Sequence, residues 1–169
     1  MKKTKQTAYT AILAALYFLL SALLKIPVAG HITLDLGYIA LTVGCFFMGP
    51  GPGALIGAVG AFLESAMLSS RGVSVGWILM NAIVGYFCGK VLYKNRNEGK
   101  KKVFLKAFTV IPTSMLAGVV VKTFADVWIY SLPLLAKIPT STAAWFFDSA
   151  VMLGLGIPLC LTLRRQIKL

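Results

Sequence analysis

Long apolar segments follow one another through almost the whole chain, and this feature constrains the fold most. A membrane helix needs about 20 apolar residues to cross the hydrocarbon core, so six crossings use about 120 residues and leave about fifty for loops and tails. We therefore expect a single integral membrane domain over residues 1–169, an all-α bundle of six transmembrane helices. The predicted spans are 8–26, 32–48, 54–68, 75–92, 104–132 and 140–163.

The composition agrees with a membrane protein. Hydrophobic residues make up 58% of the chain, charged residues only 13%, and the mean hydropathy is +0.82. Soluble domains are nearer half apolar and a quarter charged, so the excess apolar surface must face lipid. This excludes a cytosolic or secreted enzyme and a pump with its own nucleotide-binding domain. Cys45, Cys88 and Cys160 lie singly in apolar runs, so we expect no disulfide, metal site or cofactor.

Two local patterns set boundaries. Lysines before the apolar run 8–24 resemble the start of a secretory signal, but the run is long and is followed by Lys25-Ile26-Pro27 instead of a small-residue cleavage site. We interpret it as the first membrane helix. The segment 49–53 contains two prolines and three glycines, which predicts a tight turn between the second and third helices.

Lysine and arginine are divided unevenly between the two sides of the predicted bundle. Thirteen of the seventeen fall on the side of both termini and of the hydrophilic loop 93–102. Lys25, Arg71 and Lys137 fall on the opposite side, and Lys122 lies within the fifth span. Because basic residues near span ends are retained in the cytoplasm, we expect both termini to be cytoplasmic. The net charge of +12 then reflects topology, and we expect no nucleic-acid partner.

Small residues recur at four-residue spacing on three predicted helices. The pairs are Ala11 with Ala15, Gly53 with Gly57, and Gly85 with Gly89. Such stripes let helix backbones approach closely in lipid. They are typical of packing inside the bundle, and the alternative for the stripe on the first helix is docking to a separate membrane protein. The sequence does not choose between the two.

Several polar residues lie at membrane depth, where charged groups usually face a cavity, a partner or a substrate. At about 1.5 Å per residue, Lys122 and Asp148 lie roughly 12 Å below the outer ends of their spans. On the same measure Asn81 lies roughly 9 Å deep, Trp145 about 7 Å and Asp126 roughly 6 Å. The polar groups therefore converge on one level.

Helical spacing also places these groups on shared faces: Trp77 and Asn81 are four residues apart, and Glu64 shares the small-residue face of its helix. We predict an outward-facing substrate recess with aromatic walls, closed by loop residues His31, Asp35 and Arg71. The alternative is that Lys122 only neutralises Asp126 or Asp148 and that Glu64 or Asp35 caps a helix. The single histidine has no partner motif for catalysis.

The layout resembles the substrate-binding S components of energy-coupling factor (ECF) transporters. The Ala11 and Ala15 stripe, the block LDLGYIA at 34–40 and the block GPGPGALIG at 49–57 carry this resemblance. It implies a six-helix bundle in a prokaryotic cytoplasmic membrane that captures a vitamin or vitamin precursor from outside. It also implies that Ala11 and Ala15 pack against a transmembrane coupling subunit, which two ATPase subunits drive.

The substrate and the function class leave alternatives open. Trp77 and Trp145 favour an aromatic or heterocyclic ligand, with Lys122 binding a carboxylate or carbonyl and Asp148 or Glu64 binding an amine. Folate, pyridoxine, an aminopyrimidine, pantothenate and a deazaguanine precursor all fit. One alternative is a self-sufficient secondary carrier or multidrug exporter built around Glu64 or Asp148. Another is an intramembrane enzyme, although the sequence contains no catalytic motif that supports it. A third is a non-transporting scaffold.

Overall fold

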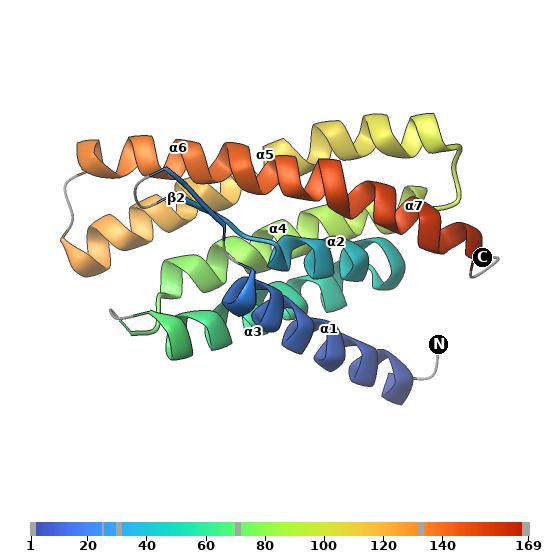
Figure 1. Cartoon of the computed structure of the whole chain (residues 1–169), viewed down its shortest axis with the longest axis horizontal. Helices are drawn as coiled ribbons and strands as arrows, with labels where there is room; N and C mark the ends of the chain where they lie inside the picture. Colours follow the sequence, from blue (N-terminus) through green and yellow to red (C-terminus); the bar gives the residue numbers. More distant parts are fainter. Residues whose placement is uncertain (1–2, 25, 30–31, 70–71, 132–133, 167–169) are drawn as a thin grey trace.

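The computed structural model describes residues 3–24, 26–29, 32–69, 72–131 and 134–166, and nearly all of them are helical. Figure 1 shows the helices running side by side along one long axis. Five helical segments are long and apolar enough to cross a membrane, and a sixth apolar helix is shorter. The predicted all-α, six-helix fold class is confirmed. The helices are α1 (Lys3–Leu23), α2 (Gly37–Met48), α3 (Pro50–Leu68), α4 (Val75–Asn95), α5 (Lys100–Tyr130), α6 (Leu134–Val151) and α7 (Ile157–Gln166).

The predicted span 32–48 is wrong in its first part. Strands β1 (Ile26–Ala29) and β2 (Ile32–Leu34) form a short antiparallel hairpin, and α2 begins only at Gly37. β-branched residues are common in both strands and favour extended backbone. The carboxylate of Asp35 then accepts hydrogen bonds from the backbone N–H of Gly37 at 2.8 Å and from the Ser21 hydroxyl at 2.7 Å. These bonds fix the change from strand to helix.

Other boundaries also differ from the sequence prediction. The first helix was predicted to reach residue 26, but it ends at Leu23 and residue 26 belongs to β1. The turn predicted over 49–53 is confined to Gly49, whose φ of 93° is accessible mainly to glycine. Pro50 starts α3, since a proline at the first helical position leaves no hydrogen bond unmade.

The last predicted span is one long helical rod. A five-residue π-helical segment, η1 (Met152–Gly156), joins α6 to α7. Figure 1 shows α6 and α7 in line along the upper edge of the bundle. This rod starts at Leu134 and ends at Gln166, so it is longer at both ends than the predicted span 140–163.

Helix α4 lies at the centre and packs against α3, α5 and α2. Glycines form its contact with α3: a Cβ at Gly53 would lie 2.6 Å from the Gly85 carbonyl oxygen, and one at Gly57 would overlap the Asn81 carbonyl. The glycine stripes of the third and fourth helices therefore serve packing inside the bundle. At this contact the two backbones touch with no side chain between them.

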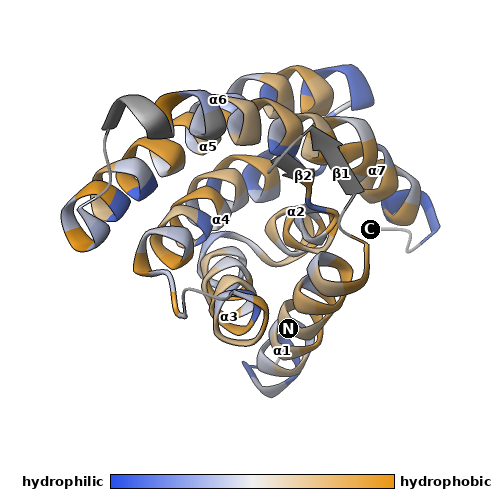
Figure 2. Cartoon of the chain, turned by 60° about the vertical axis from the view of Figure 1, so that its left-hand side comes forward, coloured by the Kyte–Doolittle hydropathy of each residue, from blue (hydrophilic) through white to orange (hydrophobic). Residues whose placement is uncertain are grey.

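Large apolar side chains remain exposed along the helices. Examples are Leu23, Leu105, Phe124 and Trp128, and hydrophobic colour dominates the helix surfaces in Figure 2. Exposed apolar surface of this extent is suited to lipid and not to water. The fold therefore presents many large apolar side chains to the bilayer, while others, such as Phe46, Met80 and Met115, form the core.

The two ends of the bundle differ in charge. Figure 1 shows both chain termini at the same end. The loop between α4 and α5 lies there too, because Arg164 of α7 donates to the backbone carbonyls of Asn97 at 3.2 Å and Glu98 at 2.8 Å. Helices α3 and α5 finish, and α4 starts, at the opposite end, where most of the polar residues predicted to line a site are located.

Candidate functional site

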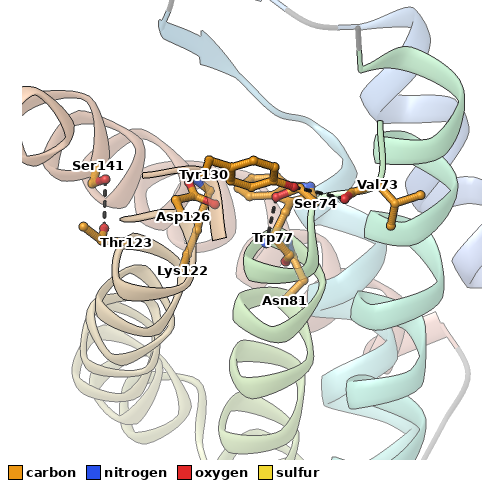
Figure 3. Close-up of polar contacts among 9 residues, drawn as sticks. All are labelled: Val73, Ser74, Trp77, Asn81, Lys122, Thr123, Asp126, Tyr130 and Ser141. Atoms are coloured by element: carbon orange, nitrogen blue, oxygen red, sulfur yellow. Dashed lines mark hydrogen bonds and ion pairs between the residues drawn. The ribbon is translucent and has the colours of Figure 1, made fainter. Parts of the chain in front are cut away.

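Trp77, in the first turn of α4, is the centre of a group of polar contacts between three helices. Its indole N–H donates to the carboxylate of Glu64 on α3 at 3.0 Å. The ammonium of Lys122 on α5 lies 5.8 Å from the centre of the indole ring, within range of a cation–π contact. Figure 3 shows Trp77 and Lys122 facing each other across the gap between α4 and α5.

Lys122 forms an ion pair with Asp126, one helical turn further along α5, at 3.1 Å. The Asp126 side chain is only 5% exposed, whereas that of Lys122 is 22% exposed. Helix α4 approaches this pair closely, because a Cβ at Gly76 would lie 3.0 Å from a carboxylate oxygen of Asp126. The ammonium group of Lys122 therefore contacts both the carboxylate of Asp126 and the indole ring of Trp77.

Asn81 lies one turn below Trp77 and is fully buried. Its side-chain amide donates to the Trp77 carbonyl at 2.9 Å, and its side-chain oxygen accepts from the Tyr17 hydroxyl at 3.2 Å. Tyr17 is the residue that sequence reasoning missed. Its only available signal was its place on the face of α1 that also carries Ala14 and Ser21, which are buried.

Two tyrosines extend the polar group under the hairpin. The rings of Tyr17 and Tyr38 meet edge to face with centroids 5.9 Å apart, and both side chains are fully buried. The carboxylates of Asp35, Glu64 and Asp148 lie close enough to act electrostatically on both hydroxyls. Asp148 is 2% exposed, so α6 contributes a buried carboxylate to this group.

Trp145 on α6 makes a hydrogen bond to α5, and its predicted contact with a substrate stays a prediction. Its indole N–H donates to the Pro112 carbonyl on α5 at 2.8 Å, which is well below the level of Lys122. The hydroxyls of Thr123 and Ser141 meet at 3.1 Å and set the register between α5 and α6, as Figure 3 shows. The structure therefore ties the indole of Trp145 to the backbone of α5.

The outer cover of the site is only partly described. The Tyr130 hydroxyl donates to the Val73 carbonyl at 3.2 Å and links the end of α5 to the segment before α4 (Figure 3). Asp35 is 4% exposed and is held by Ser21 and Gly37. His31 and Arg71, both predicted to close the recess, lie outside the described residues.

The arrangement is rich in hydrogen-bond acceptors. Four of the five acidic residues of the chain are buried in this half of the bundle: Asp35, Glu64, Asp126 and Asp148. Lys122 is the one cation that the described residues bring into contact with them. Within the described part of the chain, no three His, Cys, Asp or Glu side chains are placed to hold a metal ion.

Comparisons with known proteins identify the family. A family model described as "ECF-type riboflavin transporter, S component" matches residues 1–165. The chain belongs to this family. A solved structure with the same fold is the S component for biotin from an ECF-type ABC transporter, with a TM-score of 0.65 and 17% identity. That alignment covers 97% of this chain and 93% of the other.

Two UPF0397 proteins are similar to this chain over most of its length. The chain is 26% identical over 141 residues to a UPF0397 protein of Phytoplasma australiense, covering 79% of this chain and 72% of the relative. It is 28% identical over 135 residues to a UPF0397 protein of Exiguobacterium, covering 77% of this chain and 73% of the relative.

Family and fold together give the general role. The chain is a multi-pass cell membrane protein and a substrate-binding subunit of ECF type, and its family and fold are those of transporter components and not of enzymes. The expected resemblance to S components is confirmed. Which of the residues around Trp77 contact a substrate stays a prediction.

The alanine stripe of the first helix is exposed. Ala11 and Ala15 both lie on the open side of α1, next to the exposed side chains of Ile12 and Leu16. The buried side of the same helix carries Ala14 and Tyr17. The stripe is thus not used for packing inside this chain, in contrast to the glycines of α3 and α4.

Proposed function

We propose that this S component captures a vitamin or vitamin precursor with a planar heterocyclic ring at the Trp77 end of the bundle, with high affinity and from outside the cell. The observation that carries the proposal is the Trp77 indole, which is held by Glu64 at 3.0 Å and faced by the Lys122 ammonium at 5.8 Å. An indole fixed in this way is a flat aromatic surface with the Glu64 acceptor at its edge and the Lys122 donor above one ring face.

Riboflavin is the first ligand to test. Its isoalloxazine ring is planar and carries carbonyl acceptors for a lysine, and its ribityl hydroxyls are donors for buried carboxylates. The family description supports this choice. Folate, pyridoxine, pantothenate, aminopyrimidines and deazaguanine precursors share some of these groups and form the comparison panel, together with biotin, the ligand of the solved S component.

The energy source lies outside the chain in this proposal. We place a transmembrane coupling subunit against the exposed face of α1 around Ala11 and Ala15, where small side chains permit close backbone approach. Two ATPase subunits would drive that partner. The basic end of the bundle, with both termini, would face the cytoplasm, since lysine and arginine concentrate there.

Substrate binding is tested with the purified full chain and a matched pair of tryptophan variants. Trp77→Ala removes the proposed stacking surface, whereas Trp128→Ala removes a tryptophan that is 89% exposed on α5. Stacking on an aromatic side chain is worth about 2 kcal/mol, so we expect Trp77→Ala to weaken binding about thirtyfold. Isothermal titration calorimetry with each ligand of the panel measures it.

The outcomes separate the candidate functions. Wild-type affinity in Trp77→Ala, or equal losses in the two variants, would refute the site. The absence of binding by every vitamin of the panel would favour a scaffold. Uptake by the chain alone, reconstituted in vesicles with an ion gradient, would support a self-sufficient carrier built on Glu64 or Asp148, whereas an S component binds but does not transport.

A further inference from the structure

A hollow lies at the end of the bundle opposite Trp77, where α5 starts and α7 ends. It has a volume of about 560 Å³ and is lined by four apolar side chains, Phe104, Leu105, Phe108 and Leu161, with Lys100 and Lys101 at its edge. A second hollow of about 720 Å³ is lined by residues 98–102. We call the first the apolar hollow and the second, whose lining includes four charged residues, the polar hollow. Lys100 and Lys101 line both.

The apolar hollow belongs to the surface that faces lipid. Phe104 is 44% exposed, Leu105 66% and Phe108 59%, on a helix that is long enough to span a membrane. Phe108 lies eight residues beyond Lys100, which is about 12 Å along the helix axis. The hollow therefore runs from the membrane surface toward the hydrocarbon core, in the direction that an acyl chain takes.

The polar hollow carries an excess of positive charge. Its one carboxylate, Glu98, accepts from Lys106 at 2.7 Å, and Lys106 also donates to Asn95 at 2.5 Å. No ion pair within the described ranges involves Lys100 or Lys101, and both side chains are exposed. Arg164 is bonded to the backbone at residues 97 and 98, which fixes the rim between the loop and α7.

We propose that the two hollows together bind one anionic phospholipid. The phosphate group lies between Lys100 and Lys101, and one acyl chain lies along Phe104 and Phe108 against Leu161. Basic pockets beside transmembrane helices bind anionic headgroups, and each lysine near the surface contributes about fivefold in affinity. Free phosphate would use only the lysines and would leave the apolar hollow uncovered, so the combination of charge and apolar lining selects a lipid.

Native mass spectrometry of the detergent-purified chain, titrated with phosphatidylglycerol or with phosphatidylcholine, tests this proposal. We expect wild type to retain phosphatidylglycerol in preference to phosphatidylcholine. Lys100→Gln combined with Lys101→Gln should weaken phosphatidylglycerol binding about thirtyfold. The control, Lys90→Gln combined with Lys94→Gln, removes the same charge from exposed positions of α4 near the same end and should leave binding unchanged.

A further variant tests the acyl chain separately from the charge. Leu161→Trp fills the apolar hollow and should lower phosphatidylglycerol affinity although both lysines remain. Equal binding of the two lipids, or equal losses in the lysine variant and its control, would overturn the proposal. Competition by inorganic phosphate alone would show an anion site without a lipid. Calorimetric vitamin binding should be the same in all these variants, because Trp77 lies at the other end.

Discussion

The bundle has a lysine–carboxylate ion pair at each end, and the two pairs differ in burial and therefore in their expected effect on stability. Lys106 and Glu98 meet at 2.7 Å with side chains that are 40% and 35% exposed. Lys122 and Asp126 meet at the longer distance of 3.1 Å, but their side chains are only 22% and 5% exposed. Exposed pairs contribute little to stability, whereas removal of one partner from a buried pair is costly. Burial, and not distance, therefore decides which pair matters.

The two ends of the bundle also differ in how many of their charged residues are buried. At the basic end, lysines such as Lys94, Lys100 and Lys101 are exposed, whereas Arg96 and Arg164 are half-buried and donate to backbone carbonyls. At the Trp77 end, four carboxylates are buried: Asp35 before α2, Glu64 on α3, Asp126 on α5 and Asp148 on α6. A chain with a net charge of +12 thus buries four of its five acidic residues at the end opposite its basic loop, where charged groups are costly to desolvate.

The largest effect is expected where α3 meets α4. A Cβ at Gly57 would overlap the backbone carbonyl of Asn81, whereas one at Gly51, in the first turn of α3, would have nothing within 4 Å. We expect Gly57→Ala to lower the free energy of unfolding by about 3 kcal/mol, since backbone atoms cannot move aside cheaply. Thermal unfolding in detergent measures this.

Gly51→Ala is the control on the same helix at the basic end. It replaces glycine with a better helix former in open space, so its stability should equal or exceed that of wild type. If the two substitutions destabilise the chain equally, the close contact beneath Trp77 is not what distinguishes the two ends.

A smaller effect is expected from the buried ion pair. Lys122→Met leaves Asp126 buried without its ammonium and should cost about 2 kcal/mol of stability. Adding Asp126→Leu should recover most of this loss, because both charges are then removed together. Chemical denaturation of wild type, Lys122→Met, Asp126→Leu and the double variant gives the coupling between the residues. Additive losses would contradict a pairwise interaction and would place the role of Lys122 elsewhere.

The smallest effect is expected at the exposed pair and depends on pH. The hydrogen bond from Lys106, with the charges of Lys106 and Lys102, holds the pKa of Glu98 below its usual value. In the unfolded chain this pKa is about 4.3. The stabilisation is therefore present above about pH 4.3 and is lost as pH falls through the lower pKa of the folded state.

Glu98→Gln isolates this contribution. Wild type should be slightly more stable than the variant at pH 6, and the difference should vanish in acid and shrink in high salt, because exposed charges are screened. Melting temperatures of both proteins between pH 6 and pH 3 measure it. A difference that persists at low pH would mean that Glu98 acts through packing and not through its charge.

Much of the polar group around Trp77 could be predicted from helix geometry. Trp77, Asn81, Lys122 and Asp126 are brought together as predicted, because a rise of 1.5 Å per residue and the spacing of helical neighbours are independent of the rest of the fold. Tyr17 was missed, since a tyrosine within an apolar run looks the same whether it faces lipid or a partner. Its partner, Asn81, is 64 residues away in the chain.

The sequence by itself determined that the chain is a six-helix membrane bundle with one basic end, because the thickness of the bilayer and the cost of buried charge act on local composition. Only the tertiary structure decided that residues 26–29 and 32–34 form paired strands, that Trp145 bonds to Pro112, and that the glycines of α3 and α4 face each other. These outcomes depend on which helix lies beside which, and contacts between distant segments leave no mark on local hydropathy.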